Sequence, residues 1–395
     1  MTALEGVKVL DLGQFYFGPY CAMLMARLGA DVIKIEAPAG DPYRRLPSAT
    51  DEGISVQFQL LNSGKRLIRL DLKKPEGQKV LLGLVRTADV LVQNLSPGAL
   101  DRFGLGFDVL HAANPRLIMA SGTGYGSYGP YAGQSAMDMS IQARTAFMST
   151  TGFEDGPPIR TGPSVVDFLG ATHLITGVLA ALYQREKTGR GQHVEVALQD
   201  AAITALTSNI AGYVNSGGRM PERTGNRNGG LAVSPYNAYK TVDGWVALLC
   251  PTDAHWDRLR QLMQDPEADD GRFDTMAVRC VEMERVDEIV ERWTSKLPKQ
   301  TVGDALRQAN IPAAPILTLS ELLDDPHVNA RPVLRRMNDD RGDWLTWGSP
   351  VILSESQMVE PTRPGRLGAD TEDVLRTDLG LSPAEIEVLR SAGAI

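Results

Sequence analysis

The feature that most constrains this sequence is an alternation of strand-like and helix-like segments through its first 200 residues. Four short apolar runs are typical of parallel strands buried on both faces, at residues 7–11, 31–35, 89–93 and 117–121. Helical patterns separate them, and Pro75 stands at a favourable first helical position in one of these. Alternation of this kind builds βαβ units. We therefore predict an α/β fold with a doubly wound parallel sheet.

The length of the chain and a change in its residue composition predict a second domain. The 395 residues exceed what one compact core usually holds. Residues 215–235 are rich in Gly, Asn and Arg and carry no hydrophobic period, which indicates a linker or active-site loop. The predicted segments are a large α/β domain begun by 1–214, the loop 215–235, a small α+β domain at 236–325, a return linker at 326–366, and C-terminal helices at 367–395 that complete the large domain.

Charge and cysteine usage exclude several classes of protein. The formal net charge of −8 argues against a nucleic-acid or anionic-membrane partner, which would need basic patches. The three cysteines, Cys21, Cys250 and Cys280, are widely spaced and fit no disulfide framework or zinc site. The histidines show no metal-ligand spacing. We expect a cytoplasmic protein without a metal.

Targeting and membrane signals are weak. The first residues, MTALEGVKVLDLG, lack the basic region, long apolar stretch and cleavage site of a signal peptide. The segment 165–183 approaches membrane-spanning length, but it carries Asp167 and His173 as well as two threonines. We predict a buried helix there, with His173 in the core, and no membrane partner.

Asp167 interrupts the apolar run GPSVVDFLGATHL and admits two interpretations. Ser164 and Asp167 have the spacing of a capping box, in which the carboxylate lies at the third helical position. The helix dipole favours a carboxylate there by about 0.3–1 kcal/mol. The same position also suits a nucleophile, because the helix N-terminus helps an otherwise costly buried carboxylate to stay ionised. Spacing alone leaves both interpretations open.

Three further stretches could bind ligands. Asn94 and Arg102 follow a predicted strand at the edge where open α/β sheets bind ligands, and an arginine there suits a phosphate. Arg44 and Arg45 belong either to an anion site or to a solvated loop. Residues 124–129 spell GxGxxG, but no helical period begins within them, so we interpret these glycines as allowing close backbone approach rather than dinucleotide binding.

Taken together, nine stretches resemble the class III CoA-transferase family, which includes formyl-CoA transferases, carnitine CoA-transferases and α-methylacyl-CoA racemases. They run in family order: LEGVKVLDLG, FGPYCAMLMARLGADVIKIE, GDPYRR, NSGKRLIRLDLKKPEG, ADVLVQNLSPGALDRFGLG, SGTGYGSYGP, REKTGRGQHVEVALQDA, IPAAPI and RLGADTEDVL. The resemblance implies a Rossmann-like large domain and a small domain joined by two long linkers. It also implies a homodimer in which two such rings interlock.

The resemblance implies an activity and a site. Asp167 matches the family's nucleophile, which forms an aspartyl–acyl anhydride and then an aspartyl-CoA thioester during CoA transfer between an acyl-CoA and a small carboxylic acid. Asp138 matches an acidic position near the reaction centre. The positions that match the coenzyme A site are Leu70, Lys73, Asn94, Leu95, Arg102 and Phe103.

Departures from the family narrow the expected substrates. Met137 stands where the racemases place a histidine, which favours a transferase over a racemase or epimerase. Tyr16 and Met137 also differ from the polar residues of formyl-CoA transferases, so we expect a larger, less polar acyl group than formate or oxalate. A catalytically silent CoA-ester binding protein is the remaining alternative, and a costly carboxylate at Asp167 argues against it.

Overall fold

The structure, a computed structural model, describes residues 1–46 and 54–395 and divides into two compact units. Unit 1 comprises Met1–Ile141, Pro163–Ala202 and Pro326–Ile395, and unit 2 comprises Gln142–Gly162 and Ile203–Asp325. Residues 142–162 and 203–214, which we assigned to the large domain, belong to unit 2 in this division. Unit 1 is built from three separate stretches of chain.

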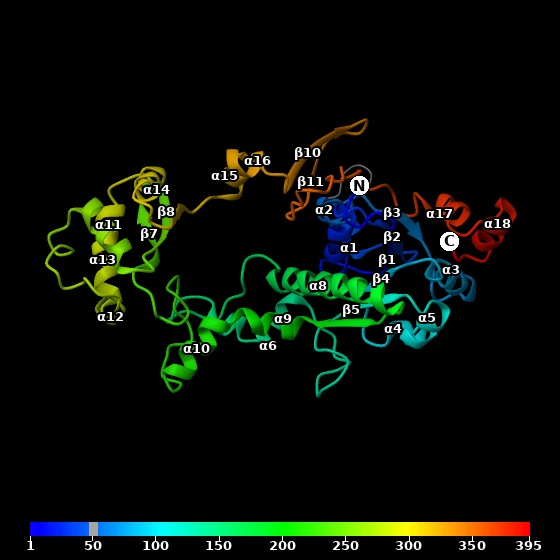
Figure 1. The fold of residues 1–395 in the computed structure, drawn as a ribbon, viewed down its shortest axis with the longest axis horizontal. Helices are drawn as coiled ribbons and strands as arrows, with labels where there is room; N and C mark the ends of the chain where they lie inside the picture. Colours follow the sequence, from blue (N-terminus) through cyan, green and yellow to red (C-terminus); the bar gives the residue numbers. More distant parts are fainter. Residues whose placement is uncertain (47–53) are drawn as a thin grey trace. The chain divides into compact units, whose positions relative to one another are not determined.

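Unit 1 is built around a six-stranded sheet in the order β3-β2-β1-β4-β5-β6, and every neighbouring pair is parallel (Figure 1). The strands are β1 (Lys8–Asp11), β2 (Asp31–Glu36), β3 (Arg66–Arg69), β4 (Val90–Gln93), β5 (Ile118–Thr123) and β6 (His193–Ala197). The strand order reverses between β1 and β4, as in doubly wound folds. The prediction of a doubly wound parallel sheet is confirmed.

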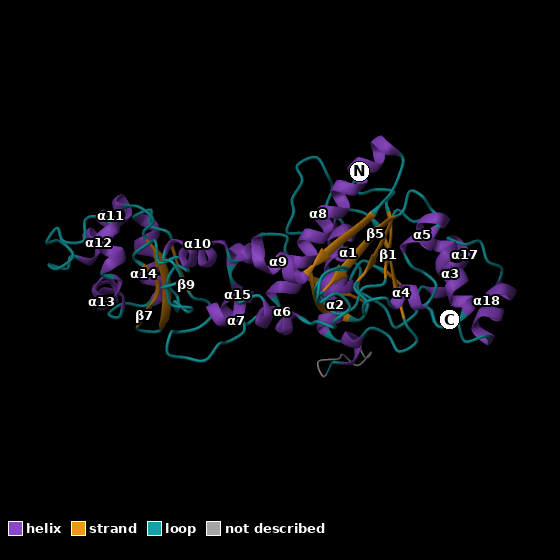
Figure 2. Cartoon of the chain, turned by 90° about the horizontal axis from the view of Figure 1, so that it is seen from below, coloured by secondary structure: helices purple, strands orange, loops and turns teal. Residues whose placement is uncertain are grey.

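Helices cover both faces of this sheet (Figure 2). On one face lie α1 (Phe17–Arg27) and α8 (Val165–Thr188). The opposite face packs against α3 (Pro75–Val85), α5 (Phe107–Ala113), α17 (Thr371–Thr377) and α18 (Pro383–Ser391). Leu10, Ile33 and Leu91 lie side by side in register on that second face, and all three are fully buried. Burial on both faces explains why these strands read as continuous apolar runs.

The remaining helices and strands of unit 1 are short and lie in the connections between the main elements. They are η1 (Pro42–Arg45), α2 (Val56–Asn62), α4 (Ala99–Arg102), α6 (Asp138–Arg144), which ends in unit 2, α9 (Leu198–Ala205), which begins in unit 1, α16 (Pro326–Ala330), and the hairpin of β10 (Leu334–Asp339) and β11 (Gly342–Trp347). The hairpin falls inside the stretch 326–366 that we predicted as a linker.

The outer edge of β3 is covered by residues 370 and 371, at the start of α17. The backbone N–H groups of Leu67 and Arg69 donate to the side chains of Asp370 and Thr371, at 2.6 and 3.0 Å. The N–H of Asp370 donates in turn to the carbonyl of Leu67. The start of α17 therefore takes the place of a further strand.

Unit 2 combines a small antiparallel sheet with helices. The three-stranded sheet has the order β7-β8-β9, from β7 (Tyr236–Thr241), β8 (Gly244–Leu249) and β9 (Ala313–Pro315). Its helices are α7 (Phe147–Thr150), α10 (Thr207–Asn215), α11 (Asp253–Met263), α12 (Met276–Val281), α13 (Met283–Thr294), α14 (Lys299–Gln308) and α15 (Leu319–Asp324). Trp256 and Ile289 lie at the centre of its separate core. Unit 2 therefore has an α+β composition.

Candidate active site

A cavity of about 530 Å³ opens at the carboxyl edge of the sheet in unit 1. Its walls come from the loops that follow β1, β3, β4 and β5 and from the starts of α8 and α9. In doubly wound sheets this edge, at the point where strand order reverses, is the usual place for a ligand. The cavity thus lies where the fold predicts a binding site.

The structure brings the predicted coenzyme A residues together in this cavity. All six line it: Leu70, Lys73, Asn94, Leu95, Arg102 and Phe103. Lys73 and Arg102 are exposed cations, and the Arg102 guanidinium also donates to the carbonyl of Pro97 at 3.0 Å. Leu70 and Phe103 add apolar surface, and both pack on the same hydrophobic core. Cations beside an apolar wall suit a ligand that carries both phosphates and an aromatic base.

Asn94, besides lining the cavity, makes two hydrogen bonds within the protein. Its Oδ1 accepts from the N–H of Gln14 at 2.7 Å, and its Nδ2 donates to the carbonyl of Gln14 at 3.0 Å. Both ends of the amide therefore hold the loop that follows β1. Gln14 and Phe15 on that loop line the cavity themselves.

Asp167 lies in the first turn of α8, and its half-buried side chain lines the cavity. Burial raises the pKa of Asp167 to about 7, and the nearby charge of Asp138 adds to the increase. A carboxyl group with a pKa near neutrality is present in both ionised and protonated forms at physiological pH. It can therefore act as a nucleophile or as a general base.

The capping box that we considered at the start of α8 is not formed. Ser164 precedes the helix, but its side chain accepts no capping hydrogen bond, because its backbone has φ −77° and ψ 62° rather than the extended geometry of a cap. Asp138 takes over this role from another part of the chain. Its Oδ2 accepts from the N–H groups of Val166 at 2.9 Å and Asp167 at 3.2 Å.

This geometry assigns different tasks to the two carboxylates. Asp138 is buried and does not line the cavity, and its carboxylate is occupied by the N–H groups of the first turn of α8. Asp167 faces the cavity, and its own carboxyl group accepts no hydrogen bond from the residues that the structure describes. The nucleophile interpretation therefore fits Asp167 better than the structural one.

Three other residues considered in the sequence, Arg44, Arg45 and His173, lie in different surroundings. Arg44 is buried and makes two hydrogen bonds of 2.7 Å to Glu36, so it is neither an open anion site nor solvated. Arg45 is exposed and donates to the carbonyl of Ala39. The prediction of a core position for His173 is wrong, because α8 keeps one exposed face and His173 lies on it.

The glycine-rich stretch 124–129 contains no helix, as we expected, and the next helix begins only at Asp138. Gly124 lines the cavity, and a Cβ on it would lie 2.3 Å from the Cβ of Ala136. Gly126 has φ +87°, a conformation that favours glycine. The glycines thus permit close backbone packing at the cavity wall.

Sequence reasoning missed a group of aromatic side chains beside Asp167. The Tyr43 ring packs edge-on against Phe15 at 5.3 Å and against Tyr16 at 4.8 Å, measured between ring centroids. Phe168 in turn contacts Tyr16 and Tyr20. Burial raises the pKa of the Tyr43 phenol, with contributions from a hydrogen bond to Tyr16 and from the charge of Asp167. These residues come from three segments, so no local pattern could reveal the group.

Among the described residues, one helix is long and apolar enough to cross a membrane by length and composition alone. This helix is α8, and half of that stretch is buried inside the structure. A helix that carries Asp167 and packs on both α1 and the sheet is accounted for as a core element of unit 1. Groups of acidic, histidine or cysteine side chains able to hold a metal are absent from the described part of the chain.

Comparison with known proteins gives a consistent result. Residues 4–371 match the family described as CoA-transferase family III. The chain is 38% identical to a formyl-CoA:oxalate CoA-transferase of Streptomyces coelicolor, over 100% of this chain and 99% of that protein. It is 35% identical to a succinyl-CoA–D-citramalate CoA-transferase of Chloroflexus aurantiacus, over 99% and 98%.

A solved structure agrees with these relatives. A CAIB/BAIF family protein from Brucella suis superposes with a TM-score of 0.84 and 31% identity, covering 95% of this chain and 99% of that one. The match of sequence and fold extends over nearly the whole length. The chain is an enzyme and belongs to class III of the CoA-transferases.

Proposed function

We propose that this enzyme moves coenzyme A between an acyl-CoA and a free carboxylic acid, with Asp167 as the covalent nucleophile. The observation that carries the proposal is the position of Asp167, a carboxyl group with a raised pKa that faces a cavity also lined by Lys73 and Arg102. Those two cations would bind the phosphates of coenzyme A, and Leu70, Leu95 and Phe103 would form the apolar wall beside its adenine.

The exchange proceeds in four balanced steps. A carboxylate oxygen of Asp167 attacks the thioester carbonyl, the C–S bond breaks, and an aspartyl–acyl anhydride and CoA thiolate form. The thiolate attacks the aspartyl carbonyl, which releases the first acid and leaves an aspartyl-CoA thioester. The incoming carboxylate and the released thiolate then repeat these two steps in reverse order. Covalent catalysis divides one difficult exchange into easier ones, and backbone N–H groups of a glycine-containing loop would stabilise the oxyanions.

The acyl group that fits this cavity is larger and less polar than formate or oxalate. Phe15, Phe17 and Met137 line the cavity with Asp167, and Met137 is 54% exposed. Tyr16, where formyl-CoA transferases carry a polar amide, packs instead into the aromatic group with Tyr43. The named relatives act on different acids, so the lining of this chain's own cavity is the better guide to its substrates.

A racemase or epimerase is the second candidate, since a carboxyl group with a pKa near 7 can also serve as a general base. Exchange at the carbon next to the thioester needs a second acid/base on the other side of that carbon. Met137 cannot supply one. Incubating the acyl-CoA with enzyme in deuterium oxide would show Cα exchange in a racemase and none in the proposed transferase. A silent CoA-ester binding protein would show neither exchange nor transfer.

We also propose an interlocked homodimer, acting in the cytoplasm. Support comes from apolar surface that each unit leaves uncovered. In unit 1, Leu179 and Tyr183 on α8 are exposed, and in unit 2 so are Ile210, Tyr213 and Val214 on α10. Apolar side chains gathered along exposed helices are typical of subunit interfaces.

One experiment tests the central proposal. Purified enzyme is incubated with a panel of acyl-CoAs and free acids, and new CoA esters are identified by mass spectrometry. Hydroxylamine added during turnover should trap the activated carboxyl group as a hydroxamate on the peptide that contains Asp167. The Asp167→Ala variant, folded and still able to bind coenzyme A, should give neither product nor hydroxamate. An adduct found only on another residue would refute the assignment.

A further inference from the structure

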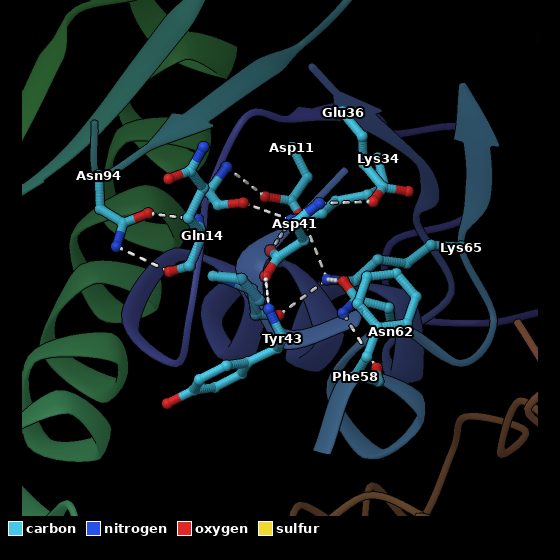
Figure 3. A network of polar contacts seen from close by, with 12 residues as sticks. Asp11, Gln14, Lys34, Glu36, Asp41, Tyr43, Phe58, Asn62, Lys65 and Asn94 are labelled. Atoms are coloured by element: carbon cyan, nitrogen blue, oxygen red, sulfur yellow. Dashed lines mark hydrogen bonds and ion pairs between the residues drawn. The ribbon is translucent and has the colours of Figure 1, made fainter. Parts of the chain in front are cut away.

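Six charged side chains lie buried next to the part of the cavity wall made by Gln14 and Phe15. This ion cluster balances three acids with three bases, each at most 6% exposed: Asp11, Lys34, Glu36, Asp41, Arg44 and Lys65. Figure 3 shows how Asp11, Lys34, Asp41 and Lys65 converge from separate strands and loops. A buried ion pair contributes little net stability, because removing both charges from water costs about as much free energy as their attraction returns. Apolar side chains of similar size often stabilise a fold equally well. The cluster therefore calls for another explanation.

Each acid in the ion cluster is matched by a base. Lys65 lies 2.8 Å from Asp11, and Lys34 lies 3.2 Å from Asp41, measured between Nζ and Oδ2. Arg44 makes its two-fold contact with Glu36. Burial raises the pKa of Asp11, but Lys34 and Lys65 outweigh this and hold it below its usual range.

Three further hydrogen bonds of the ion cluster hold the backbone of two loops. Asp11 Oδ1 accepts from the N–H of Gly13 at 2.8 Å, and Lys34 Nζ donates to the carbonyl of Gly13. Asp41 Oδ1 accepts from the N–H of Tyr43 at 2.9 Å. Since Asn94 holds both backbone groups of Gln14, side chains fix two consecutive residues completely.

The residue that follows is strained. Phe15 has φ +60°, a left-handed conformation that bulky residues adopt only when their surroundings impose it. The ring of Phe15 packs against Tyr43, whose backbone the ion cluster also holds. Gln14 and Phe15 share the cavity with Asp167. The cluster is thus connected at both ends to the loop that faces the reacting group.

We propose that the ion cluster is a positioning device for the active site. It fixes the loop of residues 13–16 in the shape that receives the acyl group, so it governs turnover at Asp167 and not the binding of coenzyme A. This inference rests on the proposed function and adds Lys34 and Asp41 to it as positioning residues. Coenzyme A contacts lie on other loops, after β3 and β4, which the cluster does not hold through Gly13 or Tyr43.

The test compares Lys34→Met with a matched control, Lys8→Met. Lys8 is the first residue of β1, whereas Asp11 of the ion cluster is the last. Lys8 pairs with Asp378 at 2.6 Å and does not line the cavity. We expect Lys34→Met to lower kcat by about ten- to a hundredfold, the scale on which misplaced active-site groups act. The KM for acyl-CoA, and the affinity for free coenzyme A measured by calorimetry, should stay near the wild-type values. Lys8→Met should leave all three unchanged.

Hydrogen–deuterium exchange reports on the loop without any need for activity. The peptide spanning 12–16 should exchange faster in Lys34→Met than in wild type or Lys8→Met, whereas the peptide spanning 70–73 should not. Should Lys34→Met fail to fold, Asp41→Asn decides: it preserves an acceptor for Tyr43 and removes only the charge that faces Lys34. We expect it to lower kcat and to loosen the same peptide.

The outcomes separate the two proposals. Unchanged exchange at 12–16 together with a wild-type kcat in the folded variants would overturn the positioning role. A raised KM with an unchanged kcat would overturn it as well. If wild-type enzyme transfers no coenzyme A at all, the proposed function fails, and faster exchange confined to the 12–16 peptide still supports the loop-holding role.

Discussion

Replacing Asp167 by asparagine removes a negative charge that lowers the free energy of unfolding when it is present in the folded protein. Burial and Asp138 raise the pKa of Asp167 from 3.8 to about 7. Between these two values the folded protein binds a proton that the unfolded chain releases. Stability therefore falls as the pH rises from about 4 to 7, and it stays at the lower level above that.

The size of this effect follows from the two pKa values. A difference of one in pKa corresponds to about 1.36 kcal/mol, so the change from 3.8 to about 7 amounts to at most about 4 kcal/mol. Asparagine carries no charge and escapes this penalty. It can also leave Asp138 bonded to the helix N–H groups. We expect Asp167→Asn to be more stable than wild type at pH 8 and close to it at pH 4.

Thermal unfolding followed by circular dichroism from pH 4 to 8 at constant ionic strength measures this difference. Asp155→Asn, at an exposed loop position, controls for the substitution itself. The melting temperature of Asp167→Asn relative to wild type should climb with pH and level off above pH 7, while CoA transfer is abolished. A difference that does not vary with pH, or a variant less stable than wild type at pH 8, would refute the reasoning about burial and Asp138.

Three further predictions concern binding, pH dependence and assembly. Arg102→Ala should raise the KM for acyl-CoA by loss of a charge-assisted phosphate contact worth about 1.5–3 kcal/mol, and an unchanged KM in steady-state kinetics would contradict the phosphate role. Asp138→Asn should move the acid limb of kcat/KM to lower pH, because it removes the charge that raises the pKa of Asp167; a limb that stays in place would exclude this coupling. Dilution should release no folded monomer from an interlocked dimer, and a reversible monomer boundary in analytical ultracentrifugation would oppose the interlocked arrangement.

Much of the fold of unit 1 could be predicted from the sequence, because the apolar residues that mark its strands are the ones that become buried. The strands are buried on both faces, so they appear as apolar runs, and Pro75 marks the start of α3 in both sequence and structure. Residues such as Lys73 and Arg102 could be placed at one site because the carboxyl ends of parallel strands share an edge.

The contacts that tune the site could not be predicted, since they join distant parts of the chain. Asp138 caps α8 from 29 residues before Asp167, and that contact replaced the local Ser164 cap. The ion cluster had one visible signal: Asp11 and Lys34 are charged residues that follow apolar residues within predicted buried strands. Which charges pair with which depends on the register of β1 and β2, where Asp11 and Lys34 are direct neighbours.

The covering of β3 by the start of α17 has a consequence for biosynthesis. Asp370 and Thr371, which occupy the outer edge of β3, leave the ribosome some 300 residues after it. Throughout that interval the nascent chain presents a strand with open hydrogen-bonding groups, the kind of edge that recruits other chains into aggregates. A chain cut short before residue 370 should therefore precipitate even though every strand of its central sheet has been made. Only when residues 370 and 371 have been synthesised can they cover the edge of β3. The solubility of the protein therefore depends on synthesis of this C-terminal segment.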